Sequence, residues 1–434
     1  MKITKKKEFI LTMLLFLSTS SVAFTQTSTL VAVGSDGRLV YTPDSNGNIV
    51  PDFSGVGYKN SEEPIPMVPV VLTVSAVSGD NTANVQLAIE TVAAMAIQAN
   101  GFRGAILFQS GTYEISGVLT ISATGIVLRG QGNSTIFLAK GTTQYDFIEI
   151  GGSSYITEET TSTRGIVDSY VPYGVDEITV ESGHTFSSGD QVLLHRIPNQ
   201  TWIDTLGMNA SGINWTPSQR SIKFQRRVVA VNGDTITLDA PVVDPIDPQY
   251  ATATLTKFTD NRINNVGIEN MRLESDYDTY PHLPGASSDE NHAWAAIAFS
   301  ANIRDAWVRS VDGYYFGYGL IDIADNAAFI TIEASNMYDP VSITTGGRKY
   351  PFSNDGQRIL FKDCFARGGR HSLETGSNTA GPVVFTNCST QGSLADDGPH
   401  HRWSTGILYD NIQTERLNFQ NRGTSGTGHG WAAG

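Results

Sequence analysis

A repeat of about 24 residues in the second half of the chain restricts the fold more than any other feature, because repeats of this length are typical of solenoids. The segments that define it begin at equal intervals: Phe361-Lys362-Asp363-Cys364, Phe385-Thr386-Asn387-Cys388 and Tyr409-Asp410-Asn411-Ile412. Earlier segments fit the same template: Val308–Val311 and Ile332–Ser335, at the same interval, and Ile268–Met271 after a longer gap. In a solenoid each such unit stacks on the next.

The repeats have the composition of strands and turns. Segments such as Arg358-Ile359-Leu360-Phe361 and Gly406-Ile407-Leu408-Tyr409 are short and apolar, and Gly, Asn, Asp and Ser separate them. A repeat of this size leaves no room for a pair of helices. We therefore predict an all-β fold, a parallel β-helix. A propeller, the competing repeat fold, needs about 40 residues per blade.

The template also predicts columns of stacked side chains. Asp363, Asn387 and Asn411 are expected to occupy one turn, and Cys364 and Cys388 to lie inside the coil. Neighbours in adjacent coils are about 4.8 Å apart with parallel side chains, a poor geometry for a disulfide. Two cysteines do not make a disulfide framework in an exported protein, although one disulfide is an open alternative; the stacked repeat favours two free thiols.

The first half of the chain is organised differently. Val85 to Ala99 reads as a helix, with Asp80 and Thr82 as capping candidates, and a helix there would cover the open end of the solenoid. Alternating apolar segments near Gly189–Leu194 and Arg227–Leu238 predict antiparallel strands. The predicted organisation is a signal peptide (1–23), an N-terminal extended segment (24–78), the capping helix and first coils (79–154), an inserted β-rich subdomain (155–250) and further coils (251–434).

The first residues form a secretion signal. Lys2 and Lys5–Lys7 precede the apolar stretch Phe9–Leu17, and Ser21-Val22-Ala23 is a small-residue cleavage site. The apolar stretch is too short to span a bilayer, and no other segment is long enough. We expect a secreted or periplasmic protein without a membrane span. Because no capping element follows His429-Gly430-Trp431, we also expect the sequence to stop short of further coils.

Three segments resemble the start of the pectate-lyase-like superfamily: Gly79-Asp80-Asn81-Thr82, Gly111–Ile115 and Leu128–Gly132. The resemblance implies a right-handed parallel β-helix and a carbohydrate-active protein, because members are mostly polysaccharide lyases and glycoside hydrolases. Gly398–Trp403 and Gly428–Trp431 resemble an exported bacterial subgroup. The calcium and arginine pattern of pectate lyases proper has no counterpart here.

Charge is unevenly distributed along the chain. The formal net charge is -14, yet residues 27–339 carry -19 while residues 340–434 carry +2 before any histidine is protonated. The overall sign disfavours a protein that coats nucleic acid. The positive terminal coils are compatible with an anionic polysaccharide as partner. The sequence does not define the oligomeric state.

The densest group of reactive side chains lies in these terminal coils. A lyase acting on uronates needs a group that neutralises the carboxylate, a base for the C5 proton and an acid for the leaving oxygen; Arg suits the first role, and His, Tyr or Lys the second. The interval from Arg370 to His401 corresponds to one coil plus a longer turn. We predict as catalytic His371, His401, Arg402, Lys349 and Tyr350, and as substrate-binding Arg348, Arg370, Glu374, His400, Trp403 and His429.

Two alternatives to a lyase remain open at this stage. A glycoside hydrolase needs two carboxyl groups about 5 to 10 Å apart, and the candidates within the group are Glu374, Asp396 and Asp397. A non-catalytic carbohydrate-binding protein on the same scaffold is the other alternative.

No cofactor is required by the sequence and no metal is assigned. Ca²⁺ is the one ion with candidate oxygen ligands: Asp276, Asp278, Asp289 and Glu290, around Tyr280-Pro281-His282. Their spacing matches no calcium loop, which favours a solvated insertion.

Overall fold

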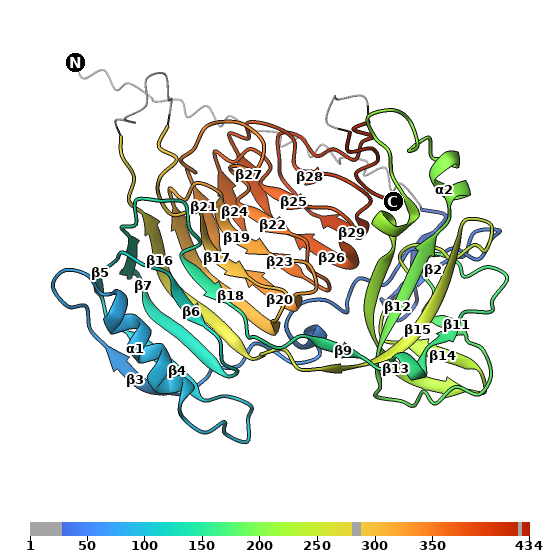
Figure 1. Ribbon diagram of the computed structural model, residues 1–434, viewed down its shortest axis with the longest axis horizontal. Helices are drawn as coiled ribbons and strands as arrows, with labels where there is room; N and C mark the ends of the chain where they lie inside the picture. The colour runs from blue at the N-terminus through green and yellow to red at the C-terminus, as the bar shows by residue number, and fades with distance from the viewer. Residues whose placement is uncertain (1–27, 280–287, 424–427) are drawn as a thin grey trace, which may run out of the picture.

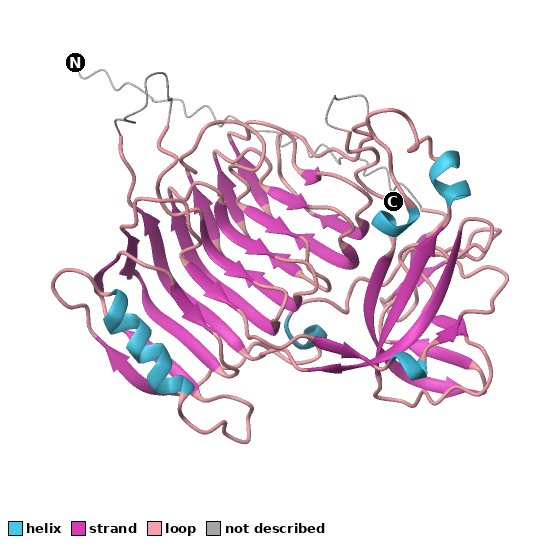
Figure 2. Ribbon diagram, in the orientation of Figure 1, coloured by secondary structure: helices cyan, strands magenta, loops and turns pink. Residues whose placement is uncertain are grey.

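The computed structural model describes residues 28–279, 288–423 and 428–434; the predicted signal peptide lies outside them. Two parallel sheets wind around one apolar core (Figures 1 and 2). This is the predicted parallel β-helix, the architecture that the resemblance to the pectate-lyase-like superfamily implied. The 13-stranded sheet contains, in spatial order, β29 (Thr405–Asp410), β26 (Ala380–Thr386), β23 (Leu360–Lys362), β20 (Ala328–Glu333), β18 (Arg304–Tyr314), β16 (Val266–Ser275), β7 (Ile126–Ala139), β4 (Gly104–Phe108) and β3 (Val70–Val74), flanked by β5 (Gly111–Ile115), β21 (Asn336–Tyr338), β24 (Phe365–Arg367) and β27 (Ser389–Gln391).

The second sheet forms the opposite wall of each coil. Its strands are β28 (Gly398–Pro399), β25 (Leu373–Thr375), β22 (Phe352–Asn354), β19 (Gly319–Ile323), β17 (Ala295–Phe299), β8 (Ile148–Ile150) and β6 (Leu119–Ile121). In each of these strands, the residues before and after the central residue point into the core. In β25, for example, Leu373 and Thr375 are fully buried. The central residues therefore point away from it, on the outer face of this sheet.

The register of the 13-stranded sheet confirms the predicted repeat. Each segment of the template pairs in parallel with the next, placing in one column Ile268, Val308, Ile332, Phe361, Phe385 and Tyr409. The last three rings are stacked with centroids 4.5 and 4.9 Å apart and interplanar angles of 5° and 2°. Both cysteines are buried and free, as predicted.

Each repeat holds one turn residue in the left-handed conformation, which explains why Asp and Asn recur at that position. The third template position has φ between 48° and 55° in all six coils, a region that Asn and Asp tolerate better than other non-glycine residues. Asn411 donates from Nδ2 to Asn387 Oδ1 at 2.7 Å, which links two coils. Ser310 and Ala334 adopt the same conformation, so stacking between coils imposes the turn even where the residue does not favour it.

Helix α1 (Thr82–Ala93) packs Val85, Ile89 and Val92 onto the first coil. It begins and ends earlier than the predicted Val85–Ala99. The Asp80 side chain accepts from the Thr82 backbone N–H at 2.9 Å and so fixes the start. The chain beyond Ala93 turns back, with Gln98 donating to the Phe102 carbonyl at 2.8 Å. The role of α1 as a cap remains a prediction.

Antiparallel strands form a separate sheet beside the C-terminal coils (Figure 1). Gln225 donates from its backbone to Gln357 Oε1 at 2.9 Å, Arg226 to the Gly381 carbonyl at 3.1 Å, and Arg220 to Asn378 Oδ1 at 2.7 Å. These contacts fasten the inserted sheet to the turns of successive coils. Its strands are β9 (Ile156–Glu158), β10 (Arg164–Gly165), β11 (Glu177–Thr179), β12 (Gln191–Pro198), β13 (Ile222–Asn232), β14 (Thr235–Leu238) and β15 (Ala251–Asp260).

Smaller elements complete the described chain. They are the hairpin β1 (Val31–Val33) and β2 (Leu39–Tyr41), helix α2 (Gln200–Thr205), and 3-10 turns at Tyr58–Ser61, Thr160–Ser162 and Pro217–Arg220. None of the helices in the described part of the chain is long and apolar enough to cross a bilayer.

Candidate active site

Stacking of the last coils brings distant aromatic and imidazole rings together. Because Phe352 pairs with Leu373, Tyr350 lies beside His371, with ring centroids 5.2 Å apart. His400 directly follows β28, and its ring centroid is 4.0 Å from that of His371. His401 is 4.8 Å from His400, and His429 is 4.6 Å from His401. We call these five residues the imidazole cluster.

Two arginines flank the cluster. Arg370 donates to the Tyr350 hydroxyl at 3.0 Å, and the same hydroxyl lies 3.2 Å from His400 Nε2. Arg422 donates to the His400 carbonyl at 2.6 Å. Tyr350 is therefore held between a fixed cation and an imidazole, an arrangement suited to proton transfer beside a bound anion.

The imidazoles are neutral near neutral pH. Burial lowers the pKa of His371 to about 4, of His401 to about 3 and of His429 to about 4, and it strongly lowers that of His400. Neighbouring imidazoles and arginines act in the same direction. A negative charge bound here would oppose both effects and raise these pKa values, because an opposite charge favours the protonated form.

His371 carries an unused acceptor. Its Nδ1 donates to the Asp396 carbonyl oxygen, which fixes the neutral tautomer. The remaining ring nitrogen, Nε2, is buried and has no hydrogen-bond partner in the described residues. A buried acceptor left without a partner costs free energy, which a bound hydrogen-bond donor would recover.

A row of acidic groups adjoins the cluster on the outer face of the seven-stranded sheet; of its carboxyls, the sequence analysis named Glu374 alone. Tyr318 donates to Ser353 Oγ at 2.9 Å, and Ser353 donates to Glu374 Oε2 at 2.9 Å. Burial and the nearby Asp355 raise the pKa of Glu374 well above its usual value.

Two further carboxyls of this face, Asp322 and Asp355, titrate near neutrality. Desolvation, assisted by Asp146, raises the pKa of Asp322 to about 6. Desolvation, assisted by Asp322, raises that of Asp355 to about 7. Asp355 is nevertheless an exposed residue. Solvent therefore reaches its carboxyl, although many protein atoms lie near it. Asp322 lies in β19 and Asp355 directly follows β22, and both strands belong to the seven-stranded sheet. The repeat template, by contrast, follows strands of the 13-stranded sheet.

Several predicted site residues have structural partners instead. Arg348 pairs with Glu290 at 2.7 Å and lies over the Trp294 ring. Lys349 accepts the backbone N–H of Arg370 at 2.7 Å through its carbonyl, so its main chain positions the cluster. The Arg402 carbonyl accepts from Arg220 at 3.0 Å, while its guanidinium lowers the pKa of His401 and His429.

Trp403 does not present a free face for a sugar. Its ring packs edge-on against Trp202, with centroids 4.7 Å apart, and its Nε1 donates to Asp244 at 2.9 Å. The side chain therefore joins the last coil to the inserted sheet.

Asp397, a predicted hydrolase carboxylate, points into the coil rather than outward. It accepts from the Leu373 backbone N–H at 3.3 Å and from Thr390 Oγ1 at 3.1 Å. Asp396 accepts from Gln420 at 2.7 Å. The structure thus offers Asp322 and Asp355 as the outward carboxyls near Glu374, in place of Asp396 and Asp397.

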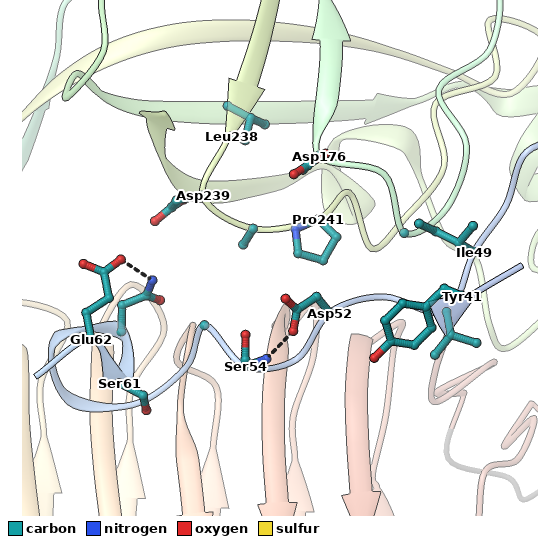
Figure 3. A pocket seen from close by; sticks show the side chains of 15 residues that line it. Tyr41, Ile49, Asp52, Ser54, Ser61, Glu62, Asp176, Leu238, Asp239 and Pro241 are labelled. Carbon is teal, nitrogen blue, oxygen red and sulfur yellow. Dashed lines mark hydrogen bonds between the residues drawn. The ribbon is translucent and has the colours of Figure 1, made fainter. Parts of the chain in front are cut away.

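A separate cavity of about 480 Å³ lies between the N-terminal segment and the inserted sheet (Figure 3). Asp52 and Glu62 line it from one side, and Asp176 and Asp239 from the other. Asp239 is engaged by Arg358, at 3.3 Å. None of the lining residues belongs to the imidazole cluster.

No group of three or more His, Cys, Asp or Glu side chains in the described ranges is arranged to hold a metal ion. The candidate calcium ligands Asp276, Asp278 and Asp289 instead line a surface pocket with Lys140, and Tyr280–His282 lie outside the described residues. Calcium binding remains a prediction.

No family model and no curated protein matches the chain. Among solved structures, the tailspike protein gp49 of Pseudomonas phage LKA1 is 16% identical over 76% of this chain and 52% of its own, with a TM-score of 0.44. An iota-carrageenase bound to iota-carrageenan fragments is 10% identical over 82% and 60%, with a TM-score of 0.35. The PL6 family alginate lyase AlyGC is 10% identical over 89% and 44%, with a TM-score of 0.33. The chain thus spans about half the length of these proteins, and the likeness is too distant to identify the reaction.

Proposed function

We propose that this protein is a secreted enzyme that cleaves a uronate-containing polysaccharide by β-elimination at the imidazole cluster. The observation that carries the proposal is that one hydroxyl contacts both a neutral imidazole and a fixed cation: Tyr350 Oη lies 3.2 Å from His400 Nε2 and 3.0 Å from Arg370 Nη1. An elimination next to a carboxylate needs these two kinds of group side by side. The predicted signal peptide supports secretion.

Each step of the elimination has a candidate group. Arg370 and Arg422 neutralise the uronate carboxylate, which makes the C5 proton more acidic. His401, half-buried at the edge of the cluster, takes that proton, and the electron pair forms the C4–C5 double bond. The bond from C4 to the glycosidic oxygen breaks, and the Tyr350 hydroxyl gives the leaving oxygen its proton. The carboxylate also raises the pKa of the base it faces toward the working range.

A glycoside hydrolase is the second candidate, favoured by the carboxyls of the adjacent face. Burial raises the pKa of Glu374 well above its usual value and that of Asp355 to about 7, and carboxyls tuned in this way can serve as an acid and a base. In this mechanism Glu374 protonates the leaving oxygen and Asp355 activates water or attacks the sugar.

The products distinguish the two reactions. The protein is incubated with a panel of uronate polysaccharides while ultraviolet absorbance of the unsaturated uronate and new reducing ends are measured together. Elimination gives both signals in equal amounts. Reducing ends without absorbance would overturn the lyase and support the hydrolase, and binding without either product would identify a carbohydrate-binding protein.

A matched pair of variants assigns the reaction to the cluster. Tyr350→Phe removes one hydroxyl and should lower kcat by about 100-fold or more, the usual contribution of a proton-transfer group. Tyr338→Phe is the control, because Tyr338 stacks on Tyr314 at 4.8 Å on the other sheet. Equal activity of both variants and the wild type would place the chemistry elsewhere.

A further inference from the structure

One row on the outer face of the seven-stranded sheet carries acids at every second strand. The paired register runs Glu149, Ala298, Asp322, Ser353, Glu374 and Gly398. The row contains no cation, and no ion pair involving Glu149, Asp322 or Glu374 occurs in the described chain. Asp355 adds a further carboxyl one row away. The cations of this region lie at one end, where Arg370 and Arg422 flank the imidazole cluster.

This charge distribution acts differently on charged and neutral sugars. Strands in a sheet are about 4.8 Å apart, close to the length of one extended pyranose unit, so a polysaccharide lying across the strands meets about one strand per sugar. A carboxylate facing Asp322 or Asp355 would be repelled by the ionised form of these groups, and it could bind only if they took up a proton. A neutral sugar would instead donate its hydroxyls to the same oxygens.

The cluster itself contains a second, independent sign of a ligand. His371 is 2% exposed and its Nε2 has no hydrogen-bond partner in the described residues. A sugar hydroxyl can donate to this nitrogen, whereas a carboxylate cannot. The arginines therefore receive one carboxylate, and the groups beside them match hydroxyls.

We propose that the substrate is a heteropolysaccharide in which uronates are separated by neutral sugars, and that Asp322 and Asp355 exclude chains charged at every sugar. The uronate binds at Arg370 and Arg422, and the neutral sugars lie beside Asp322 and Asp355, the carboxyls of this face that solvent reaches. This specificity rests on the proposed function for its site, but it is tested by binding rather than by turnover.

The test compares polymers that differ only in charge density. Galacturonan and a glucuronate polymer are each used in native form and with about half of the carboxyls chemically reduced to neutral sugars. Binding is measured by calorimetry with the Tyr350→Phe variant, so that cleavage during the titration is slowed by about 100-fold. The half-reduced form of at least one polymer should bind about tenfold more tightly than its native form, since like charges across an interface are strongly unfavourable.

A variant assigns the effect to the acidic row. Asp322→Asn keeps the shape and removes the charge, so it should reduce this preference to about threefold or less by tightening binding of the native polymer, and added salt should act in the same direction. Glu333→Gln, on the opposite sheet, should leave the preference unchanged.

The possible outcomes separate the two proposals. Tighter binding of the fully charged polymers, or no binding of any polymer, would overturn the specificity. A preference for half-reduced polymer without any product from the wild-type enzyme would preserve the specificity and overturn the proposed reaction.

Discussion

The two sheets of each coil present opposite electrostatic designs on their outer faces. On the 13-stranded sheet, one register row alternates in sign through Arg129, Glu269, Arg309, Glu333 and Lys362. Adjacent members form ion pairs at 2.9 to 3.0 Å for three of the four neighbouring pairs. On the seven-stranded sheet, the equivalent row carries Glu149, Asp322 and Glu374 with neutral residues between them.

The difference shows which face is arranged for stability and which for a ligand. Neighbouring opposite charges stabilise the stacked strands. Burial without a salt-bridge partner raises the pKa of a carboxyl, as it does for Asp322, Asp355 and Glu374. Such groups reduce stability at neutral pH and cluster at functional sites. The acidic face also ends at the imidazole cluster.

The largest expected effect follows from breaking the paired face where it is buried. Glu269 is fully buried and accepts from Arg129 at 2.9 Å, Arg309 at 3.0 Å and Trp307 Nε1 at 2.8 Å. Glu269→Gln should lower the free energy of unfolding by about 3–5 kcal/mol, because two largely buried arginines lose the fully buried carboxylate that pairs with both. Denaturant titration measures the loss. A change below about 1 kcal/mol would contradict the assignment of this face to stability.

Breaking the cluster should lower activity far more than an equal truncation elsewhere. His371→Ala and His401→Ala are each expected to lower kcat/KM by about 100-fold on the cleaved polysaccharide. His371 is buried, so its truncation also leaves a cavity and should lower thermal stability, whereas the half-buried His401 should cost less. His184→Ala, in the loop between β11 and β12, is the control. Full turnover by both cluster variants would place the reaction outside the cluster, and a loss of activity by His401→Ala that follows its loss of thermal stability would indicate a structural role instead.

The repeat that underlies the paired face was predictable because stacking makes it periodic, whereas the ion pairs of that face were not predicted. Position 361 and its equivalents lie in one strand of each coil, and their constant spacing predicted that these side chains stack in a column. The turn positions Asp363 and Asn387 fix the same register, which placed the cysteines that follow them inside the coil as free thiols. The acidic row escaped prediction because its strands are short and follow turns of varying length. The interval along the chain from Asp322 to Ser353 is longer than that from Ser353 to Glu374, so no single period describes the row.

The members of the site were only partly predictable for a related reason. His371, His400, His401 and Tyr350 form one cluster, as their chemistry suggested. Neither Arg422 nor the packing of Trp403 could be inferred, because both depend on how an irregular segment folds back onto the coils. No periodic signal reports which way a turn side chain points.

The destabilisation caused by the acidic face should appear as a pH dependence of the free energy of unfolding. Because folding raises the pKa of Asp355 from 3.8 to about 7, the carboxyl ionises more readily in the unfolded chain. Stability is complete below the unfolded pKa and falls as pH rises through the folded value. Asp355→Asn should therefore match the wild type near pH 4 and exceed it near pH 8, by about 1 kcal/mol after allowance for solvent screening. Thermal unfolding at both pH values measures this, and a variant that is less stable at pH 8 would show that Asp355 has a favourable partner.

The smallest effect tests whether burial, rather than pairing alone, gives the paired face its strength. Glu333 and Lys362 form an ion pair at 3.0 Å in the same row as Glu269, but their side chains are 27% and 42% exposed. Water screens both charges, and each long side chain loses freedom when it pairs, so Glu333→Gln should cost at most about 0.5 kcal/mol. The loss should disappear in high salt, unlike that of Glu269→Gln. A cost comparable with that of Glu269→Gln would mean that the whole row acts as one coupled network, and that the contrast between the two faces extends to their solvent-exposed parts.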